Sequence, residues 1–170
     1  MKRIVLTFFA IVSIVLGYAQ DATKFKALFI YNFTKQIDWP AAEKTGDFVI
    51  SIVGSNEMEA QLKTIVTGKK VGNQDIVLKK LKTVDEVTKC HILYLASSAC
   101  SASNMTTVLS KLEGASTLIV TDRPGSLEKG ACINFLIRAE KIKFELNKQA
   151  LTDRKLQIST YLENMSASVE

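Results

Sequence analysis

The sequence predicts a small Rossmann-like α/β domain with a central, mostly parallel sheet, helices on both faces and a C-terminal antiparallel hairpin. Two observations predict this class. Short β-branched or apolar runs, typical of buried strands, alternate along the chain with amphipathic stretches of helical period. Towards the C-terminus, two short alternating runs are separated by only two residues, which is the spacing of a β-hairpin.

The first predicted helix covers residues 24–39 and stops at Pro40, because the residue before a proline is biased away from the α region. Its helical spacing predicts one core-facing stripe, widened by Ile30 and made of Phe25, Leu28, Phe29, Phe33 and Ile37. Tyr31 and Trp39 lie off this stripe. We expect Trp39 to pack in the core at the helix end, whereas the role of Tyr31 stays open.

The other elements follow from runs of apolar residues and the turn residues between them. Strands are predicted at 48–54, 75–81, 91–96 and 117–121. Helices are predicted at 57–66 and 101–112, with a turn or short helix at 83–88. The hairpin is predicted as strands 133–138 and 141–146 joined by Ala139-Glu140, and a closing helix at 151–165.

The first nineteen residues predict export through a cleavable signal peptide. A basic start at Met1–Arg3 precedes an apolar run from Ile4 to Leu16, and Gly17-Tyr18-Ala19 has the small residues of a cleavage site. The apolar run falls short of the roughly 20 residues of a spanning helix, which disfavours an uncleaved anchor. Cleavage after residue 19 leaves residues 20–170 as one periplasmic domain without a membrane span, and lowers the formal charge from +5 to +3.

The lysines are spread in small groups and lack the Arg-rich, aromatic-interleaved pattern of a nucleic-acid surface, so we expect no nucleic-acid partner. Cys90, Cys100 and Cys132 would lie in a compartment where disulfides persist. An odd number leaves one bridge and a spare thiol, or no bridge, and the spacing does not fix a pairing.

No catalytic, cofactor-binding or metal-binding motif is present in the sequence. His91 is the single histidine, and its place at the head of an apolar strand favours a structural or solvent-facing role over a ligand role. Walker, G-x-G-x-x-G and G-x-S-x-G motifs are all missing. We therefore expect a protein that is not an enzyme.

Polar residues after a central strand are the best candidates for ligand contact. Asp122 and Arg123 follow the strand at 117–121, at the edge where open α/β sheets bind ligands. Arg123 would contact an anion and Asp122 would be a polar anchor, although we favour an Asp-Arg-Pro-Gly turn with exposed charges as the explanation of this pair. Asn32 and Asn134 are amides inside apolar patterns, and each either touches a partner or satisfies a buried backbone group.

Several segments together resemble the YfiR family of periplasmic regulators, and they cover almost the whole chain after the signal. These segments are KALFIYNFTKQIDWP, FVISIVG, CHILYLA, GACINFLIRAEKIKFELN and LTDRKLQISTYL. The resemblance implies a small, often dimeric α/β domain that represses a membrane-bound diguanylate cyclase through its periplasmic region. It also implies release by envelope stress or by an outer-membrane lipoprotein, and disulfides that support the fold.

Two hypotheses about function follow. The leading one is an exported regulatory binding protein that acts on a membrane signalling protein. The alternative is a periplasmic small-molecule binding module, with its pocket at the carboxyl ends of the central strands near Gly54, Ala96 and Asp122.

Overall fold

The computed structural model describes residues 22–169 and confirms the predicted fold class. The predicted signal peptide lies outside the described residues. The main sheet has the strand order β10-β8-β7-β6-β5-β2-β4-β3. Within residues 22–169, no helix combines the length and the apolar character that a membrane crossing needs.

Four parallel strands form the centre of the sheet, in the order β6-β5-β2-β4. They are β2 (Phe48–Val53), β4 (Gln74–Leu81), β5 (Ile92–Leu95) and β6 (Leu118–Thr121). Every residue of β5 and β6 is buried, as expected for strands covered on both faces. A short strand, β3 (Lys70–Val71), pairs with the start of β4 and was not predicted.

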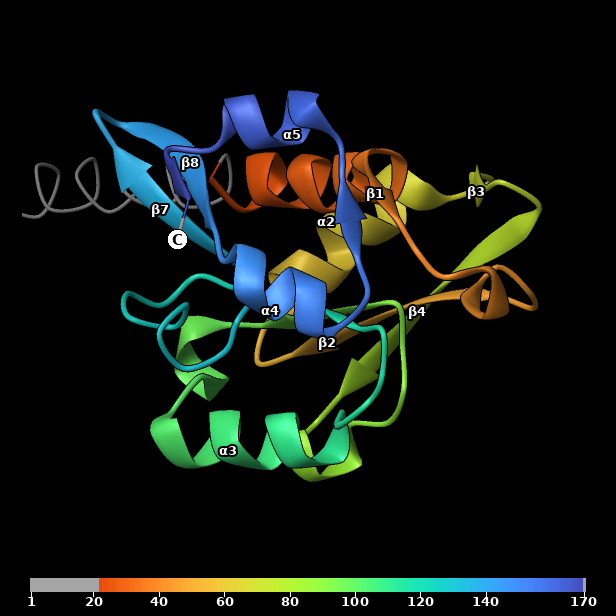
Figure 1. Cartoon of the computed structure of the whole chain (residues 1–170), viewed down its shortest axis with the longest axis horizontal. Helices are drawn as coiled ribbons and strands as arrows, with labels where there is room; N and C mark the ends of the chain where they lie inside the picture. The colour runs from red at the N-terminus through yellow and green to blue at the C-terminus, as the bar shows by residue number, and fades with distance from the viewer. Residues whose placement is uncertain (1–21, 170) are drawn as a thin grey trace, which may run out of the picture.

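Helices cover both faces of the sheet. The first helix, residues 22–36, and α2 (Asn56–Val66) lie on one face, and α3 (Ala102–Lys111) lies on the other (Figure 1). Serine side chains fix two of the starts: Ser55 Oγ accepts a hydrogen bond from the Met58 N–H, and Ser101 Oγ accepts one from the Asn104 N–H. Single 3-10 turns complete the connections at Ala41–Glu43, Val84–Glu86 and Ser97–Ala99.

The hairpin has the predicted boundaries, with β7 at Ile133–Arg138 and β8 at Lys141–Leu146. Ala139 and Glu140 both have positive φ, 49° and 60°, as a two-residue primed turn requires. Phe135 and Phe144 are paired across the strands, and both rings contact Phe29 and Phe33 of the first helix. This aromatic cluster holds the first helix over the hairpin.

The predicted stripe of the first helix has the right period, but the buried face is rotated relative to it, so only part of the stripe faces the core. Its buried positions are Ala27, Ile30, Phe33 and Thr34, and Ile37 is buried just after the helix end. Ile30, Phe33 and Ile37 are therefore buried as predicted. Phe25 and Leu28, predicted to face the core, are instead exposed. Successive residues turn by about 100° around a helix, so placing the small Ala27 against the sheet rotates both larger side chains outwards.

One short strand pair explains why two of the predicted helices have different boundaries in the structure. The first helix ends at residue 36 rather than 39, because β1 (Ile37–Asp38) pairs antiparallel with β9 (Gln157–Ile158). The same pairing breaks the closing helix that was predicted at 151–165. In place of that single helix, the structure has two short helices, α4 (Lys148–Asp153) and α5 (Thr160–Met165). They are separated by Lys155 at φ 57° and by β9. The chain then ends in β10 (Ser168–Val169), parallel to β8.

Candidate functional site

Asp122 lies at the carboxyl end of β6 and is the centre of a hydrogen-bonded network. Its Oδ2 accepts from Lys26 Nζ at 2.6 Å and from the Tyr94 hydroxyl at 2.7 Å, and its Oδ1 accepts from the Ser97 N–H at 2.6 Å. Burial raises the pKa of Tyr94 above its usual range, and the Asp122 carboxylate raises it further, so the hydroxyl stays a donor. Both carboxylate oxygens are therefore occupied by partners from the protein itself.

The crevice between the ends of β2 and β5, where the chain reverses its winding direction, is filled by the protein. Gly54 has φ 83°, and a Cβ placed on it would lie 2.8 Å from the Ala99 Cβ. Ser98 Oγ donates to the Gly54 carbonyl at 3.1 Å. Ligands of open α/β sheets bind at such a switch point. Here the loop after β5 packs into it.

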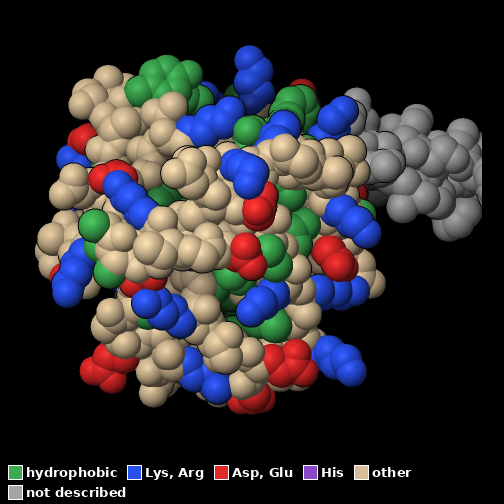
Figure 2. Space-filling view, turned by 90° about the vertical axis from the view of Figure 1, so that its right-hand side faces the viewer, with side chains coloured by type: hydrophobic (Ala, Val, Ile, Leu, Met, Phe, Trp, Pro, Cys, Tyr) green, Lys and Arg blue, Asp and Glu red, His purple; other side chains and the backbone are tan. Residues whose placement is uncertain are grey.

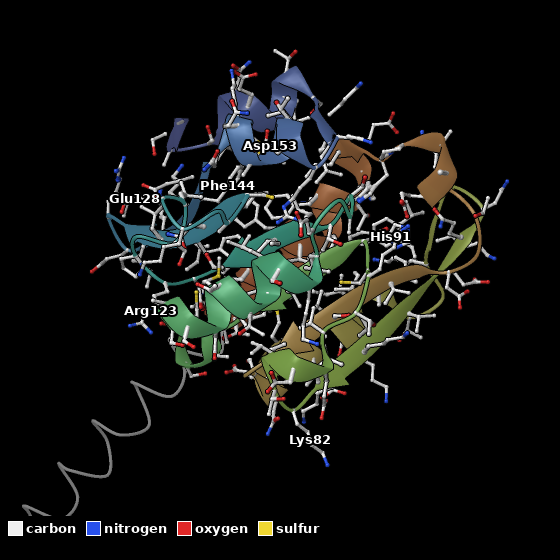
Figure 3. All side chains as sticks on the ribbon, turned by 60° about the horizontal axis from the view of Figure 1, so that its bottom comes forward. Lys82, His91, Arg123, Glu128, Phe144 and Asp153 are labelled. Atoms are coloured by element: carbon white, nitrogen blue, oxygen red, sulfur yellow. The ribbon has the colours of Figure 1, made fainter. Side chains whose placement is uncertain are left out.

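The other two predicted polar contacts near this edge, Arg123 and Asn134, differ in exposure and in their partners. Arg123 is exposed, and its Nη1 lies 3.4 Å from the Ser97 carbonyl oxygen. Figure 3 shows it at the opposite end of the sheet from His91. Asn134 is only 3% exposed, and its Oδ1 accepts from the Thr121 hydroxyl at 2.9 Å. Asn134 is thus a buried structural amide, which was one of the two interpretations left open by the sequence.

Both ring nitrogens of His91 are hydrogen-bonded to backbone groups of other segments, which is a structural role. The Val49 N–H donates to its Nδ1 at 3.0 Å, and its Nε2 lies 2.8 Å from the Glu43 carbonyl oxygen. Because Nδ1 accepts, Nε2 carries the proton and donates. The ring also stacks on Phe48 with centroids 4.3 Å apart. Among residues 22–169, the structure brings no three His, Cys, Asp or Glu side chains together as a metal site.

The three cysteines are separate, buried thiols in the structure. Burial raises the pKa of both Cys90 and Cys132 to about 11. Cys100 Sγ lies 3.4 Å from Ser126 Oγ. A buried neutral thiol is a poor nucleophile, because reactivity depends on the thiolate.

The exposed large hydrophobic side chains of the described residues gather around the first helix. They are Phe25 (54% exposed), Leu28 (37%), Ile137 (67%), Tyr161 (63%) and Met165 (37%). Four of them line two hollows that share Phe29. We call the hollow with Phe25, Ile137 and Ile142 the hairpin surface, and the one with Asn32, Gln36, Tyr161 and Met165 the α5 surface.

Of the predicted contacts on the first helix, only Asn32 lies on one of these surfaces. It is exposed, so it does not satisfy a buried backbone group. Trp39 is buried as predicted, edge-to-face on Phe48 at 5.0 Å, and is not accessible to a partner. Tyr31 is half-buried, with the ammonium groups of Lys35 and Lys69 each 4.4 Å from its ring centroid.

The face that carries β3 has a different character. Figure 2 shows basic and acidic side chains mixed across it, with apolar side chains scattered between them. Several of its charges are paired, for example Lys70 with Asp75 at 2.8 Å and Lys80 with Glu59 at 3.4 Å. Sequence reasoning missed the hairpin surface because it assigned Phe25 and Phe29 to the core, and it missed the α5 surface because it placed Tyr161 in one continuous closing helix. The surplus of aromatic residues on the first helix was the available signal.

The sheet order, the filled crevice and the exposed apolar surfaces define a small α/β domain of Rossmann-like topology whose accessible apolar groups lie on one side of the first helix. The chain belongs to the YfiR/HmsC-like family, whose model matches residues 23–167. The resemblance seen in the sequence is thereby confirmed.

Solved structures share the fold at low sequence identity. A conserved domain protein from Vibrio cholerae O1 biovar El Tor matches with a TM-score of 0.57 and 11% identity, over 87% of this chain and 60% of that chain. An ABC domain from Streptococcus pneumoniae in complex with L-Trp matches with a TM-score of 0.52 and 12% identity, over 72% of this chain and 55% of that one. This chain thus spans somewhat over half the length of both. No curated protein matches it.

Proposed function

We propose that this chain is an exported, non-enzymatic regulator that binds the periplasmic region of a membrane signalling protein, such as a diguanylate cyclase, and represses it. Family membership supports this role. The observation that carries it is the α5 surface, where an aromatic residue and a methionine stand exposed beside two amide side chains, Asn32 and Gln36.

The composition of the α5 surface suits a protein partner. Tyrosine and methionine are enriched at protein interfaces, and tyrosine is among the residues that contribute most to binding. Tyr161 is 63% exposed, so a partner could bury much of its ring. Asn32 is exposed and can hydrogen-bond to a partner backbone without first losing an internal bond.

Repression would be stoichiometric. A regulator that binds one arrangement of its target more tightly than another shifts the population towards that arrangement by its difference in affinity. The predicted signal peptide supports a periplasmic location for residues 20–170, which form one domain in this proposal. A homodimer, and release by an outer-membrane lipoprotein, are further expectations from the family.

Capture from membranes tests the proposal. Tagged mature protein, residues 20–170, is mixed with solubilised inner membranes of its own source, and the level of cyclic-di-GMP is measured with and without the gene. We expect one signalling protein to be retained and the cyclic-di-GMP level to rise on deletion. Tyr161→Asp with Asn32→Asp should abolish retention, whereas Lys79→Glu on the exposed side of β4 should not. Retention of no membrane protein, together with an unchanged level, would rule the proposal out.

The small-molecule alternative has less support. The L-Trp-bound domain is similar in fold alone, at 12% identity. The predicted pocket near Gly54, Ala96 and Asp122 coincides with the filled crevice and with the carboxylate that Lys26 and Tyr94 already occupy. A rise in unfolding temperature with a metabolite, growing with its concentration, would favour it.

A further inference from the structure

The hairpin surface differs from the α5 surface because cations surround it. Exposed basic residues stand at the start of the first helix and along the hairpin: Lys24, Arg138, Lys141 and Lys143. None of these four forms an ion pair with a carboxylate of residues 22–169, so their charges are not neutralised within the described part of the chain. Glu140 is the one acidic residue that lines this hollow among those described.

The hairpin separates its apolar and basic side chains by strand alternation. Ile137 faces Ile142 across the strands, on the face that also holds the Phe135–Phe144 pair. Arg138 and Lys141 face each other on the opposite side, next to the turn, where Lys141 also reaches the edge of the hollow that Ile137 and Ile142 line. Like charges directly opposite each other destabilise a strand pair, so this pair of cations has no structural benefit within the domain. The result is an amphipathic projection with an unpartnered apolar face and positive charge at its end.

We infer that the hairpin surface docks on an anionic lipid bilayer, with Phe25 and Ile137 entering the interface and the four cations held at the headgroups. Exposed apolar side chains beside lysine and arginine bind membrane surfaces by combining hydrophobic burial with attraction to anionic lipids. Long basic side chains can reach the headgroups from the far side of a thin hairpin, and charge acts over roughly 8–10 Å at physiological salt.

The position of the chain start agrees with a bilayer as the occupant. Ala22, the first residue of the first helix, lines the hairpin surface. The apolar run of the predicted signal ends at Leu16, six residues before Ala22, so the chain between them can span at most about 22 Å. Export would therefore release the domain with this surface beside the membrane.

A second copy of this chain fits the hairpin surface less well. A symmetric dimer through it would bring Arg138 and Lys141 of both copies together, and like charges repel at an interface. Docking on the bilayer goes beyond the proposed regulation, and it would also raise the local concentration of the domain near a membrane-bound target. The α5 surface, which shares Phe29 with the hairpin surface, would stay available beside it.

Vesicle co-sedimentation tests the inference with purified residues 20–170. Vesicles of phosphatidylcholine alone are compared with vesicles containing one quarter phosphatidylglycerol, at low and high salt. We expect binding to the anionic vesicles that falls with salt. Phe25→Asp with Ile137→Asp should weaken it at least about tenfold, and so should Arg138→Glu with Lys141→Glu.

The matched control is Lys79→Glu with Lys82→Glu, which makes the same change of charge at exposed lysines in and just after β4. It should keep at least half of the vesicle binding, and thermal unfolding should show every variant folded. Equal binding by the hairpin variants and the wild type would overturn the inference, as would no binding by the wild type. A concentration-dependent dimer that Ile137→Asp abolishes would also overturn it, because a second copy would then be the occupant.

These outcomes separate the inference from the proposed regulation. Vesicle binding without capture of a signalling protein would support the hairpin surface and reject the regulator. Capture that depends on Tyr161 but no vesicle binding would do the reverse.

Discussion

Lys26 of the first helix and Asp122 at the end of β6 form an ion pair at 2.6 Å that spans 96 residues of sequence. Less than a fifth of the surface of each side chain is accessible to solvent, so the pair is partly shielded from water. Asp122 also accepts from Tyr94 and from the Ser97 backbone, so it joins the first helix, β5 and the loop after β5. Both of its carboxylate oxygens have protein partners, at the position where the sequence predicted a ligand contact.

Asp122→Asn should lower the free energy of unfolding by about 1–3 kcal/mol, because an amide accepts on one atom only and leaves a buried donor unpaired. Lys26→Met should cost less, since Tyr94 and Ser97 still satisfy the carboxylate. Urea unfolding measures both, and the double variant gives their coupling. Two additive effects would contradict the pairing.

The buried thiols predict a loss of stability at alkaline pH. Burial raises the pKa of Cys90 and Cys132 from 9.0 to about 11 in the folded protein. A raised thiol pKa favours the neutral form on folding, so this contribution is complete below pH 9 and is lost as the pH rises through 11. At full ionisation it amounts to about 3 kcal/mol per thiol.

Urea unfolding between pH 8 and pH 10.5 checks this prediction by comparing the free energy of unfolding of the wild type with that of the double variant Cys90→Ala with Cys132→Ala. The wild type should be the more stable protein at pH 8, and the difference should narrow steadily above pH 9. A difference independent of pH would mean that the thiols are not buried in solution.

Gly54→Ala should destabilise the domain by at least about 2 kcal/mol, through the cost of positive φ and the overlap with Ala99. Gly46→Ala is the matched control. Gly46 has φ 69° but nothing within 4 Å of an added Cβ, so only the backbone cost of about 1 kcal/mol applies. Equal effects on the unfolding temperature would show that the crevice between β2 and β5 is open.

Ala139→Asn with Glu140→Gly should stabilise the hairpin by about 1 kcal/mol, because Asn-Gly suits the primed turn that these residues occupy at positive φ. Thermal unfolding measures the gain. Lys155→Gly, at φ 57°, tests the same backbone effect away from the hairpin and should also stabilise. A loss of stability in the hairpin variant would indicate a different turn.

Local pattern was enough for much of the fold. β-Branched runs and the turn residues that bound them predict the strands from Phe48 to Val53 and from Ile133 to Arg138, together with the hairpin turn at Ala139-Glu140. The boundaries at residues 36 and 151–165 could not be predicted in the same way. They depend on the pairing of β1 with β9, which are more than a hundred residues apart and only two residues long each.

The candidate contacts show the same division. Burial of Trp39 was predicted from its place at the end of the expected helix. The different environments of Asp122, Arg123 and Asn134 depend instead on neighbours from other elements. Asn32 was identified from the sequence, but its companion Tyr161 was assigned to a continuous closing helix.

The sequence by itself determined the fold class, the family and the helical period of KALFIYNFTKQIDWP, because these depend on residue type and spacing along the chain. Tertiary structure alone decided the phase of that helix. Ala27 is small enough to approach the sheet, while Leu28 and Phe25, about 100° and 200° away around the helix, are left outside. The periodicity of a helix shows that it has an apolar face, and the elements packed against it select which apolar residues remain exposed for a partner.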